Sequence, residues 1–204
     1  MLKKIKMSNK IISHYDMLID ENNDSFRDSP ALQEYMNQWD GQVFIDSMKL
    51  DRTKKVLEIG VGTGRLAAKV APQCFELIGI DISPKTICRA KENLSEYKNV
   101  KLICADFAQS VFDETFDVIY SSLTMMHFEN KQQIIAKVDS LLREGGRFCL
   151  SIDKNQSEYI DMGTRKIKIY PDTLDGIVSL IEISSMSVSC TFETEFAHIV
   201  VCTK

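Results

Sequence analysis

The chain has 204 residues, of which 44% are hydrophobic and 26% charged, and its formal net charge is -4. A chain of this length and hydrophobic content can bury the core of one domain with a small appendage. Its negative charge gives no general attraction to nucleic-acid phosphates or anionic lipids, so neither is an expected partner.

Targeting signals and cysteine usage bear on the compartment. Residues 1–16 carry basic residues but no unbroken apolar run of about 7 to 15 residues, which a signal peptide requires. No stretch reaches the roughly 20 apolar residues of a membrane span. The six cysteines include no C-x-x-C pair, so we interpret them as reduced core residues. These features predict a cytoplasmic protein that does not enter a membrane.

The first 50 residues differ from the rest of the chain. An acidic, loop-like stretch at 19–30 precedes residues 31–48, where apolar side chains recur at helical spacing. We therefore expect an N-terminal helical segment, 1–50, that packs against a main domain spanning 51–204. The acidic stretch begins like a calcium loop at Asp20, but Ser25 and Ala31 occupy positions that need glycine and glutamate. No metal site is expected.

From residue 54 onward, short apolar runs alternate with amphipathic helices. Regular alternation of this kind predicts a parallel sheet covered on both faces, a doubly wound α/β fold. Ser83 and Pro84 form a helix-start signal, and Gly145 with Gly146 is expected to close a helix. The expected strands are 55–60, 76–81, 100–106, 116–122 and 147–153, and the expected helices are 64–72, 83–97 and 130–146.

The last 50 residues follow a different pattern. A less regular stretch follows Asp153, and a helix is expected at 171–183. Two β-rich runs, 187–196 and 197–204, then follow each other with no helix between them. A parallel pair would need a crossover of a dozen or more residues, so these runs predict an antiparallel hairpin at the edge of the sheet.

A glycine-rich turn follows the first expected strand. Gly60, Gly62 and Gly64 let the backbone approach a ligand closely and adopt positive φ. The turn departs from the dinucleotide pattern G-x-G-x-x-G, because Arg65 takes the sixth position. Glu58 lies within the otherwise apolar strand and needs a hydrogen-bonding or cationic partner if it is buried. These departures favour a ligand with a cationic amino group over a pyrophosphate.

Carboxylates end three consecutive strands. Besides Glu58, Asp81 lies 21 residues after Gly60, about where an acidic residue binds ribose hydroxyls, and Asp106 ends the next strand. Ligands of open α/β sheets bind beyond the carboxyl ends of the strands. All three acids are therefore expected at one ligand-binding edge.

Several motifs together resemble the class I S-adenosylmethionine-dependent methyltransferases of the small-molecule type. The resemblance covers about residues 54–153 through "VLEIGVGTG", "GIDIS", "CADF", "FDVIYSSLTMMH" and "LLREGGRF". It implies a seven-stranded, mostly parallel Rossmann-like sheet whose last strand is antiparallel, and S-adenosylmethionine as the cofactor. It also implies that the segment before the sheet forms a lid, with Tyr15 as the preferred contact.

The resemblance also assigns roles to single residues. It implies that Glu58 and the turn from Gly60 through Gly62 to Gly64 bind the amino acid end of the cofactor. Its nucleoside half is assigned to four residues: Asp81 for the ribose hydroxyls, Ile82 against the adenine, Asp106 for the adenine amino group, and Phe107 beside it. Ser121 and Ser122 are expected to flank the methionine portion.

Methyl transfer makes modest demands on the protein. Alignment of nucleophile, methyl and sulfur alone can be worth roughly 7–11 kcal/mol, so no catalytic triad is needed. A base matters only if the acceptor must lose a proton. His127, just past the fourth strand, is the candidate base or acceptor contact, with a packing role as the alternative.

We therefore expect a methyltransferase acting on O, N or C of a small-molecule acceptor, as a monomer or homodimer. The fourth strand ends in "YSSL" and lacks the [ND]-P-P-[YF] signature of enzymes that methylate exocyclic base amines. Two alternatives stay open. One is a non-catalytic S-adenosylmethionine-binding scaffold or sensor, and the other is an NAD(P)-dependent oxidoreductase, which Glu58 and the shifted glycine disfavour.

Overall fold

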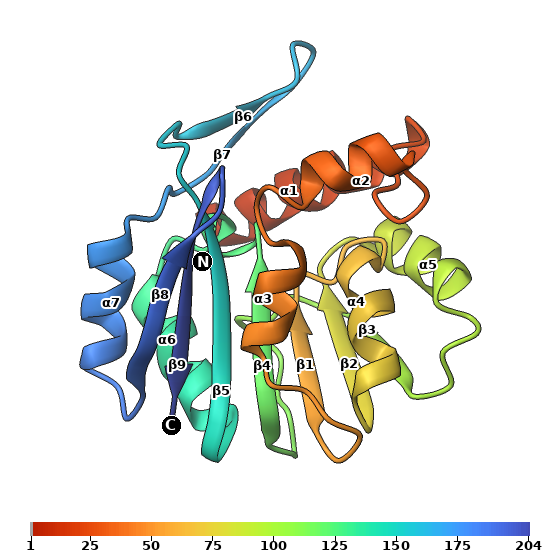
Figure 1. Ribbon diagram of the computed structural model, residues 1–204. Coiled ribbons are helices and arrows are strands. Elements are labelled where there is room, and N and C mark those ends of the chain that lie inside the picture. The colour runs from red at the N-terminus through yellow and green to blue at the C-terminus, as the bar shows by residue number, and fades with distance from the viewer. Residues whose placement is uncertain (1) are drawn as a thin grey trace.

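The computed structural model describes residues 2–204, with side chains from Asn9 onward. Within this range, seven strands form one sheet in the order β3-β2-β1-β4-β5-β9-β8 (Figure 1). The strands are β1 (Lys55–Ile59), β2 (Glu76–Asp81), β3 (Val100–Cys104), β4 (Phe116–Ser122), β5 (Leu142–Asp153), β8 (Ser187–Glu193) and β9 (Ala197–Thr203).

Strand pairing confirms the predicted topology. The pairs β2–β3, β1–β2, β1–β4 and β4–β5 are parallel, whereas β9 is antiparallel to both β5 and β8. The C-terminal hairpin is therefore the antiparallel edge that the missing crossover predicted. Strand order reverses between β1 and β4, which is where an open α/β sheet binds its ligands.

Helices cover both faces of the sheet. On one face α3 (Gly41–Ser47), α4 (Arg65–Val70) and α5 (Pro84–Asn93) bury Phe44, Leu66 and Ile87 against strand residues. On the other face, α6 (Lys131–Leu141) and α7 (Leu174–Glu182) contribute Ile135, Val138 and Ile181 to the second core cluster. Two layers of helices on a central sheet confirm the doubly wound α/β fold.

The start of α5 shows how local sequence signals set an element. Ser83 precedes Pro84, and its Oγ accepts a hydrogen bond of 3.1 Å from the amide of Thr86. Proline at the first helical position loses nothing, because its missing N–H would have no partner there. The predicted helix start is confirmed.

The N-terminal 50 residues form three helices with different surroundings. Helices α1 (Leu2–Asp20) and α2 (Pro30–Met36) lie across the carboxyl ends of the parallel strands (Figure 1). Helix α3 instead packs into the core, where Phe44 and Ile45 are fully buried. Only α1 and α2 are therefore placed to cover the ligand-binding edge.

The structure departs from the sequence prediction at the end of α6. The helix ends at Leu141, four residues before the glycine pair that was expected to close it. Strand β5 begins at Leu142, and Gly145, with φ +73°, lies where the β4–β5 register shifts. The amide of Gly145 donates to the carbonyl of Lys204, so pairing with the C-terminal strand, which is remote in sequence, decides the helix end.

Two further expectations differ. The stretch after Asp153 contains a separate two-stranded hairpin, β6 (Tyr159–Asp161) with β7 (Lys166–Lys168). The six free cysteines are not all in the core, because three are exposed: Cys88, Cys104 and Cys190. Within the described residues, no helix combines the length and apolar character that a membrane crossing requires.

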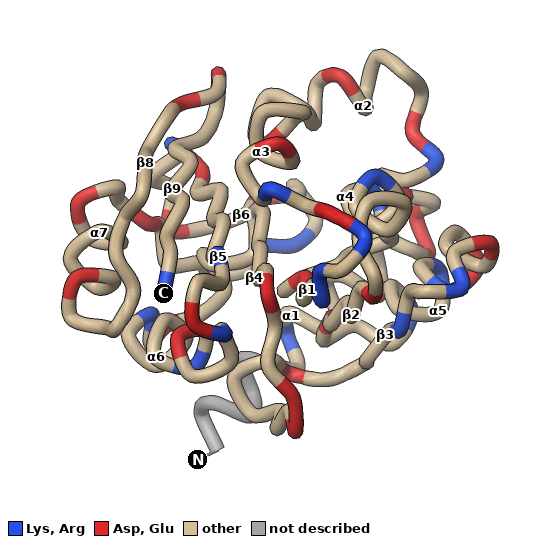
Figure 2. Tube along the Cα trace, turned by 60° about the horizontal axis from the view of Figure 1, so that its bottom comes forward, with Lys and Arg blue, Asp and Glu red and all other residues tan. Residues whose placement is uncertain are grey.

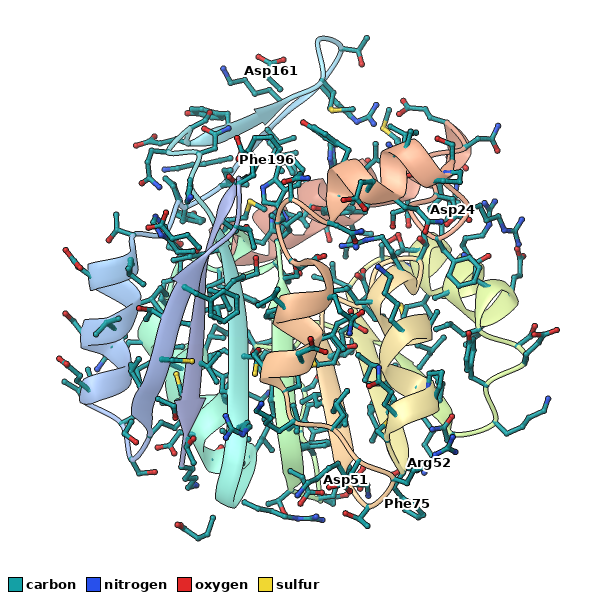
Figure 3. The ribbon with its side chains drawn as sticks, in the orientation of Figure 1. Asp24, Asp51, Arg52, Phe75, Asp161 and Phe196 are labelled. Carbon is teal, nitrogen blue, oxygen red and sulfur yellow. The ribbon has the colours of Figure 1, made fainter. Side chains whose placement is uncertain are left out.

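The sheet core should dominate stability. Phe148 on β5 is fully buried, so Phe148→Ala should lower the free energy of unfolding by about 3–5 kcal/mol through lost burial and a residual cavity. Phe75 is 65% exposed, and Figure 3 shows it at the end of the molecule opposite Asp161. Phe75→Ala should change the free energy of unfolding by less than about 0.5 kcal/mol. Urea unfolding of both variants measures the difference. Equal losses would contradict this assignment of the core.

Candidate functional site

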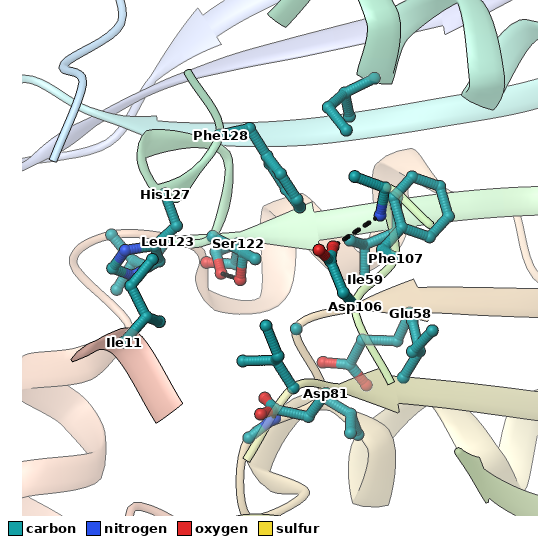
Figure 4. A pocket seen from close by; sticks show the side chains of 18 of the residues that line it. Ile11, Glu58, Ile59, Asp81, Asp106, Phe107, Ser122, Leu123, His127 and Phe128 are labelled. Atoms are coloured by element: carbon teal, nitrogen blue, oxygen red, sulfur yellow. Dashed lines mark hydrogen bonds between the residues drawn. The ribbon is translucent and has the colours of Figure 1, made fainter. Parts of the chain in front are cut away.

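A cavity of about 710 Å³ lies at the carboxyl ends of the parallel strands. Its wall comes from β1, β2, the segments after β3 and β4, and the overlying α1. Figure 4 shows His127, Leu123 and Ile11 on one side of it and Asp106, Phe107 and Glu58 on the other. A cavity of this volume fits a ligand of drug or cofactor size.

The glycine turn borders the cavity through two of its three glycines. Gly60 and Gly62 line it, and Gly60 has φ +80°. A Cβ on Gly60 would lie 1.9 Å from Oγ1 of Thr124, so only glycine fits between the turn and the segment after β4. Gly64 does not line the cavity. With φ +99° it precedes α4, and its missing Cβ makes room for Leu94.

Glu58 has the buried partner that the sequence required. It is 3% exposed, and the hydroxyl of Tyr120 donates to its Oε2 at 2.7 Å. Burial raises the pKa of Glu58 to about 8, although the hydrogen bond from Tyr120 and the charge of Arg65 act in the opposite direction. The carboxyl group therefore holds its proton easily, and a cation in the cavity would favour its ionised form.

Arg65, which also lines the cavity, is paired elsewhere. Its guanidinium donates to both carboxylate oxygens of Asp40, at 3.1 and 2.5 Å. Asp40 is buried and also accepts a hydrogen bond of 3.0 Å from Oγ of Ser122. This network joins the segment before α3 to the cavity floor. The sequence analysis did not identify Asp40, because nothing near it in sequence shows that it meets Arg65.

The other two strand-end acids also face the cavity. Asp81 accepts hydrogen bonds from the amides of Gly62, at 3.1 Å, and Ser83, at 2.9 Å. Burial is the main cause that raises its pKa. Asp106 accepts one from the amide of Ala108 at 2.9 Å, the dashed line in Figure 4. Carboxylate oxygens have further lone pairs, so both acids can still accept hydrogen bonds from a ligand.

The remaining predicted residues divide between the cavity and the layer behind it. Ile82, Phe107 and Ser122 line the cavity. Ser121 does not line it: it is buried in β4, and its hydroxyl donates to the carbonyl of Ile59 at 3.0 Å. Alternation of side chains along a strand explains why only one of the two neighbouring serines reaches the cavity.

Tyr15 and His127 meet at the cavity, although they are 112 residues apart. The Tyr15 hydroxyl lies 2.7 Å from Nε2 of His127, and the rings pack edge to face. Burial, aided by the charges of His14 and Lys131, lowers the pKa of His127 to about 4. Burial also raises the pKa of Tyr15. At neutral pH both side chains are therefore uncharged.

Sequence reasoning missed several cavity residues. The sequence assigned no role to these residues, and only the fold brings them together: Ile11, Ser25, Thr124, Phe128 and Tyr170. Tyr170 lies in the stretch for which no regular structure was expected. Among residues whose side chains are described, no group of three or more His, Cys, Asp or Glu is arranged to hold a metal ion.

Stability should depend on pH through Glu58. Because its folded-state pKa is raised from 4.5 to about 8, the stabilisation from its protonated form is complete below the unfolded value and is lost as pH rises through the folded one. The melting temperature of the ligand-free wild type, relative to Glu58→Gln, should thus fall between about pH 5 and about pH 8.5. Thermal unfolding across this range measures it. Exposed Glu144→Gln is the control, and a pH-independent difference would contradict the raised pKa.

Comparison with known proteins shows the family of this chain. A family model described as "Methyltransferase domain" matches residues 50–187. "Phosphoethanolamine N-methyltransferase 1" of Arabidopsis thaliana is 34% identical over 82 residues, which are 39% of this chain and 17% of that protein. The chain thus spans less than a fifth of that relative's length.

Two solved structures match the chain over nearly its whole length. The N-methyltransferase NodS of Bradyrhizobium japonicum, in complex with S-adenosyl-L-homocysteine, has a TM-score of 0.72 at 16% identity and covers 97% of this chain and 98% of its own. The [4+2]-cyclase SpnF has a TM-score of 0.76 at 14% identity and covers 97% of both chains. Both matches show the shared fold. The family model covers more than half of the residues of this chain, and the chain therefore belongs to the methyltransferase-domain family.

Proposed function

We propose that this chain binds S-adenosylmethionine in the cavity and catalyses transfer of its methyl group to O, N or C of a small-molecule acceptor. The observation that carries the proposal is the convergence of Glu58, Asp81 and Asp106 around the glycine turn. Carboxylates suit the ammonium, hydroxyl and amino groups of that cofactor. Membership of the methyltransferase-domain family supports the same reaction.

The two halves of the cofactor fit different parts of the wall. Glu58, with Gly60 and Gly62, would hold the amino acid end, where a cationic ammonium favours the ionised carboxylate. Gly64 would act indirectly, through the packing of α4. Ser122 would flank the methionine portion, whereas Ser121 would support β1 from behind.

The nucleoside half would use the ends of β2 and β3. Asp81, held by two backbone amides, would accept hydrogen bonds from the ribose hydroxyls. Asp106 would accept one from the adenine amino group. Ile82 and Phe107, which line the same region, would contact the faces of the adenine ring.

The protein's share of the chemistry is alignment, exclusion of water and control of one proton. When bound, S-adenosylmethionine supplies a methyl group already activated on a sulfonium. We propose that α1, with Tyr15, forms the lid over the cavity, consistent with an N-terminal lid segment within residues 1–50. His127 would then orient the Tyr15 hydroxyl and accept at Nε2 the proton that this hydroxyl passes on from the acceptor. With a pKa near 4 its imidazole is a weak base, so it would act only as the acceptor's proton becomes acidic during transfer.

A second candidate function is a non-catalytic or differently reactive protein that keeps this cofactor site. The specific observation is the match over nearly the whole chain to SpnF, a [4+2]-cyclase. Turnover separates this candidate from methyl transfer. An NAD(P)-dependent oxidoreductase is disfavoured by the family and by the acidic wall.

The charge of the cavity bears on the acceptor. Besides Glu58, three acidic residues line the cavity, Asp81, Asp106 and Glu129, and a polyanion such as nucleic acid would be repelled there. Lys and Arg are interspersed with Asp and Glu along the described trace (Figure 2). A small-molecule acceptor, a cytoplasmic location and a monomeric or homodimeric state remain the predictions made from the sequence.

Cofactor binding is tested by thermal shift with S-adenosylmethionine, S-adenosylhomocysteine, NAD and NADP. The first two should stabilise the protein. Calorimetry should show that Asp81→Ala weakens the binding of S-adenosylmethionine by roughly tenfold to a hundredfold, because charge-assisted hydrogen bonds are lost. Asp113→Ala, at an exposed position, should leave the affinity unchanged. Stabilisation by the dinucleotides alone would overturn the proposed cofactor.

Catalysis is tested by S-adenosylhomocysteine formation in the presence of a metabolite extract. Wild-type protein should turn the cofactor over, and His127→Ala should reduce the rate by about a hundredfold or more if its base is needed. His198→Gln, which changes a histidine on β9, should not affect the rate. Persistent absence of turnover with cofactor bound would favour the non-catalytic candidate. Full activity of His127→Ala would remove His127 from the mechanism.

A further inference from the structure

The hairpin of β6 and β7, here called the hairpin arm (residues 159–168), lies against α1. Within the described residues it forms its own two-stranded sheet, apart from the main one. It extends beyond the carboxyl ends of the strands, and β7 contacts α1 (Figure 1). Neither the resemblance nor the proposed function gives it a role, so its contacts with α1 need a physical account.

One residue of the hairpin arm carries most of the polar contact. Arg165, in the turn before β7, donates from Nη1 and Nη2 to the two carboxylate oxygens of Glu21, at 2.5 and 2.6 Å. Its Nε donates to Nδ1 of His14 at 3.1 Å. The guanidinium thus bridges a helical residue and the residue just after α1 with a geometry that lysine cannot reproduce.

The contact continues from His14 to the cavity. His14 is 3% exposed, and its ring packs edge to face on Tyr15 at 5.1 Å between centroids. The Tyr15 hydroxyl in turn lies 2.7 Å from Nε2 of His127. A continuous series of contacts therefore joins Glu21 and Arg165, outside the cavity, to the two uncharged polar side chains within it.

The opposite side of α1 is also held. Asp16 accepts hydrogen bonds from Oγ of Ser83, at 2.6 Å, and from the amide of Lys85, at 3.1 Å. Asp20 forms an ion pair with Lys85. With α5 on one side and the hairpin arm on the other, α1 is fastened across the cavity between them.

We propose that Arg165 is a positioning residue, which keeps α1 closed over the cavity and so holds Tyr15 against His127. This inference rests on the proposed function for one point, the identity of the ligand that the closed cavity holds. Loss of the Arg165 contacts releases one side of α1. A bound cofactor then leaves faster, because its exit no longer requires the ion pair and the His14 hydrogen bond to break.

The contacts of Arg165 with Glu21 and His14, here called the clamp, also depend on pH in a definite direction. To accept from Arg165, Nδ1 of His14 must be unprotonated. Burial and the charge of Arg165 lower the pKa of His14, whereas Glu21 acts to raise it; Tyr15 and His127 face it uncharged. Because the folded-state pKa is depressed, the contact is fully present above the unfolded value and is lost as pH falls through the folded one.

The test measures dissociation of S-adenosylhomocysteine from the full chain by stopped flow. Arg165→Gln should raise the dissociation rate about tenfold, because a bidentate charged pair is lost. Arg165→Lys should give an intermediate rate, since it keeps a charge near Glu21 but cannot also donate to His14. Lys166→Gln is the matched control, because Lys166 lies on the same arm and pairs with Asp161, and its rate should equal the wild type's.

Two readouts separate positioning from general stability. In the wild type the rate should be constant above about pH 6.5 and rise as pH is lowered further, whereas in Arg165→Gln it should be high throughout. A wild-type rate in Arg165→Gln, even with a lowered melting temperature, would overturn the proposal and leave Arg165 a structural role only.

Hydrogen exchange of the ligand-free protein tests the clamp without any cofactor. Amides of residues 11–20 should exchange faster in Arg165→Gln than in Lys166→Gln. If S-adenosylhomocysteine does not bind the wild type, the proposed function fails. The exchange rates of the two variants then decide by themselves whether Arg165 holds α1 in place. Equal exchange in the two variants would overturn it.

Discussion

Parallel pairing of β2, β1 and β4 is the constraint on which the rest of the structure depends. It brings the carboxyl ends of these strands to one edge, so residues at or near the end of each strand enter a common space. Glu58, Asp81 and Ser122 meet there although they are far apart in the chain. Helices on both faces bury the central strands, which leaves this edge as the place where a large cavity can form.

Several buried polar groups of the cavity wall have partners that compensate their burial. Glu58 is satisfied by Tyr120, and Arg65 by Asp40, which also receives Ser122. An unpartnered charge at these positions would cost several kcal/mol, as an order of magnitude. The partners therefore preorganise the wall, and a ligand meets groups that are already oriented.

Cover over the cavity comes from outside the sheet. Helix α1 reaches it with Ile11 and Tyr15, and its attachments to α5 and to the hairpin arm lie on either side of those residues. The edge of the sheet thus supplies the acidic wall of the cavity, whereas α1 supplies its cover.

The sequence by itself determined the features that depend on local pattern. Short apolar runs predicted the parallel strands, and the missing crossover predicted the antiparallel edge. Position near the strand ends identified Glu58, Asp81 and Asp106 as candidate site residues. Tertiary structure alone decided where α6 ends, because the amide of Gly145 pairs with Lys204, and it alone joined Tyr15 to His127 and Arg165 to His14. Such contacts depend on how distant segments pack, and neither residue of a pair carries a local signal of its partner.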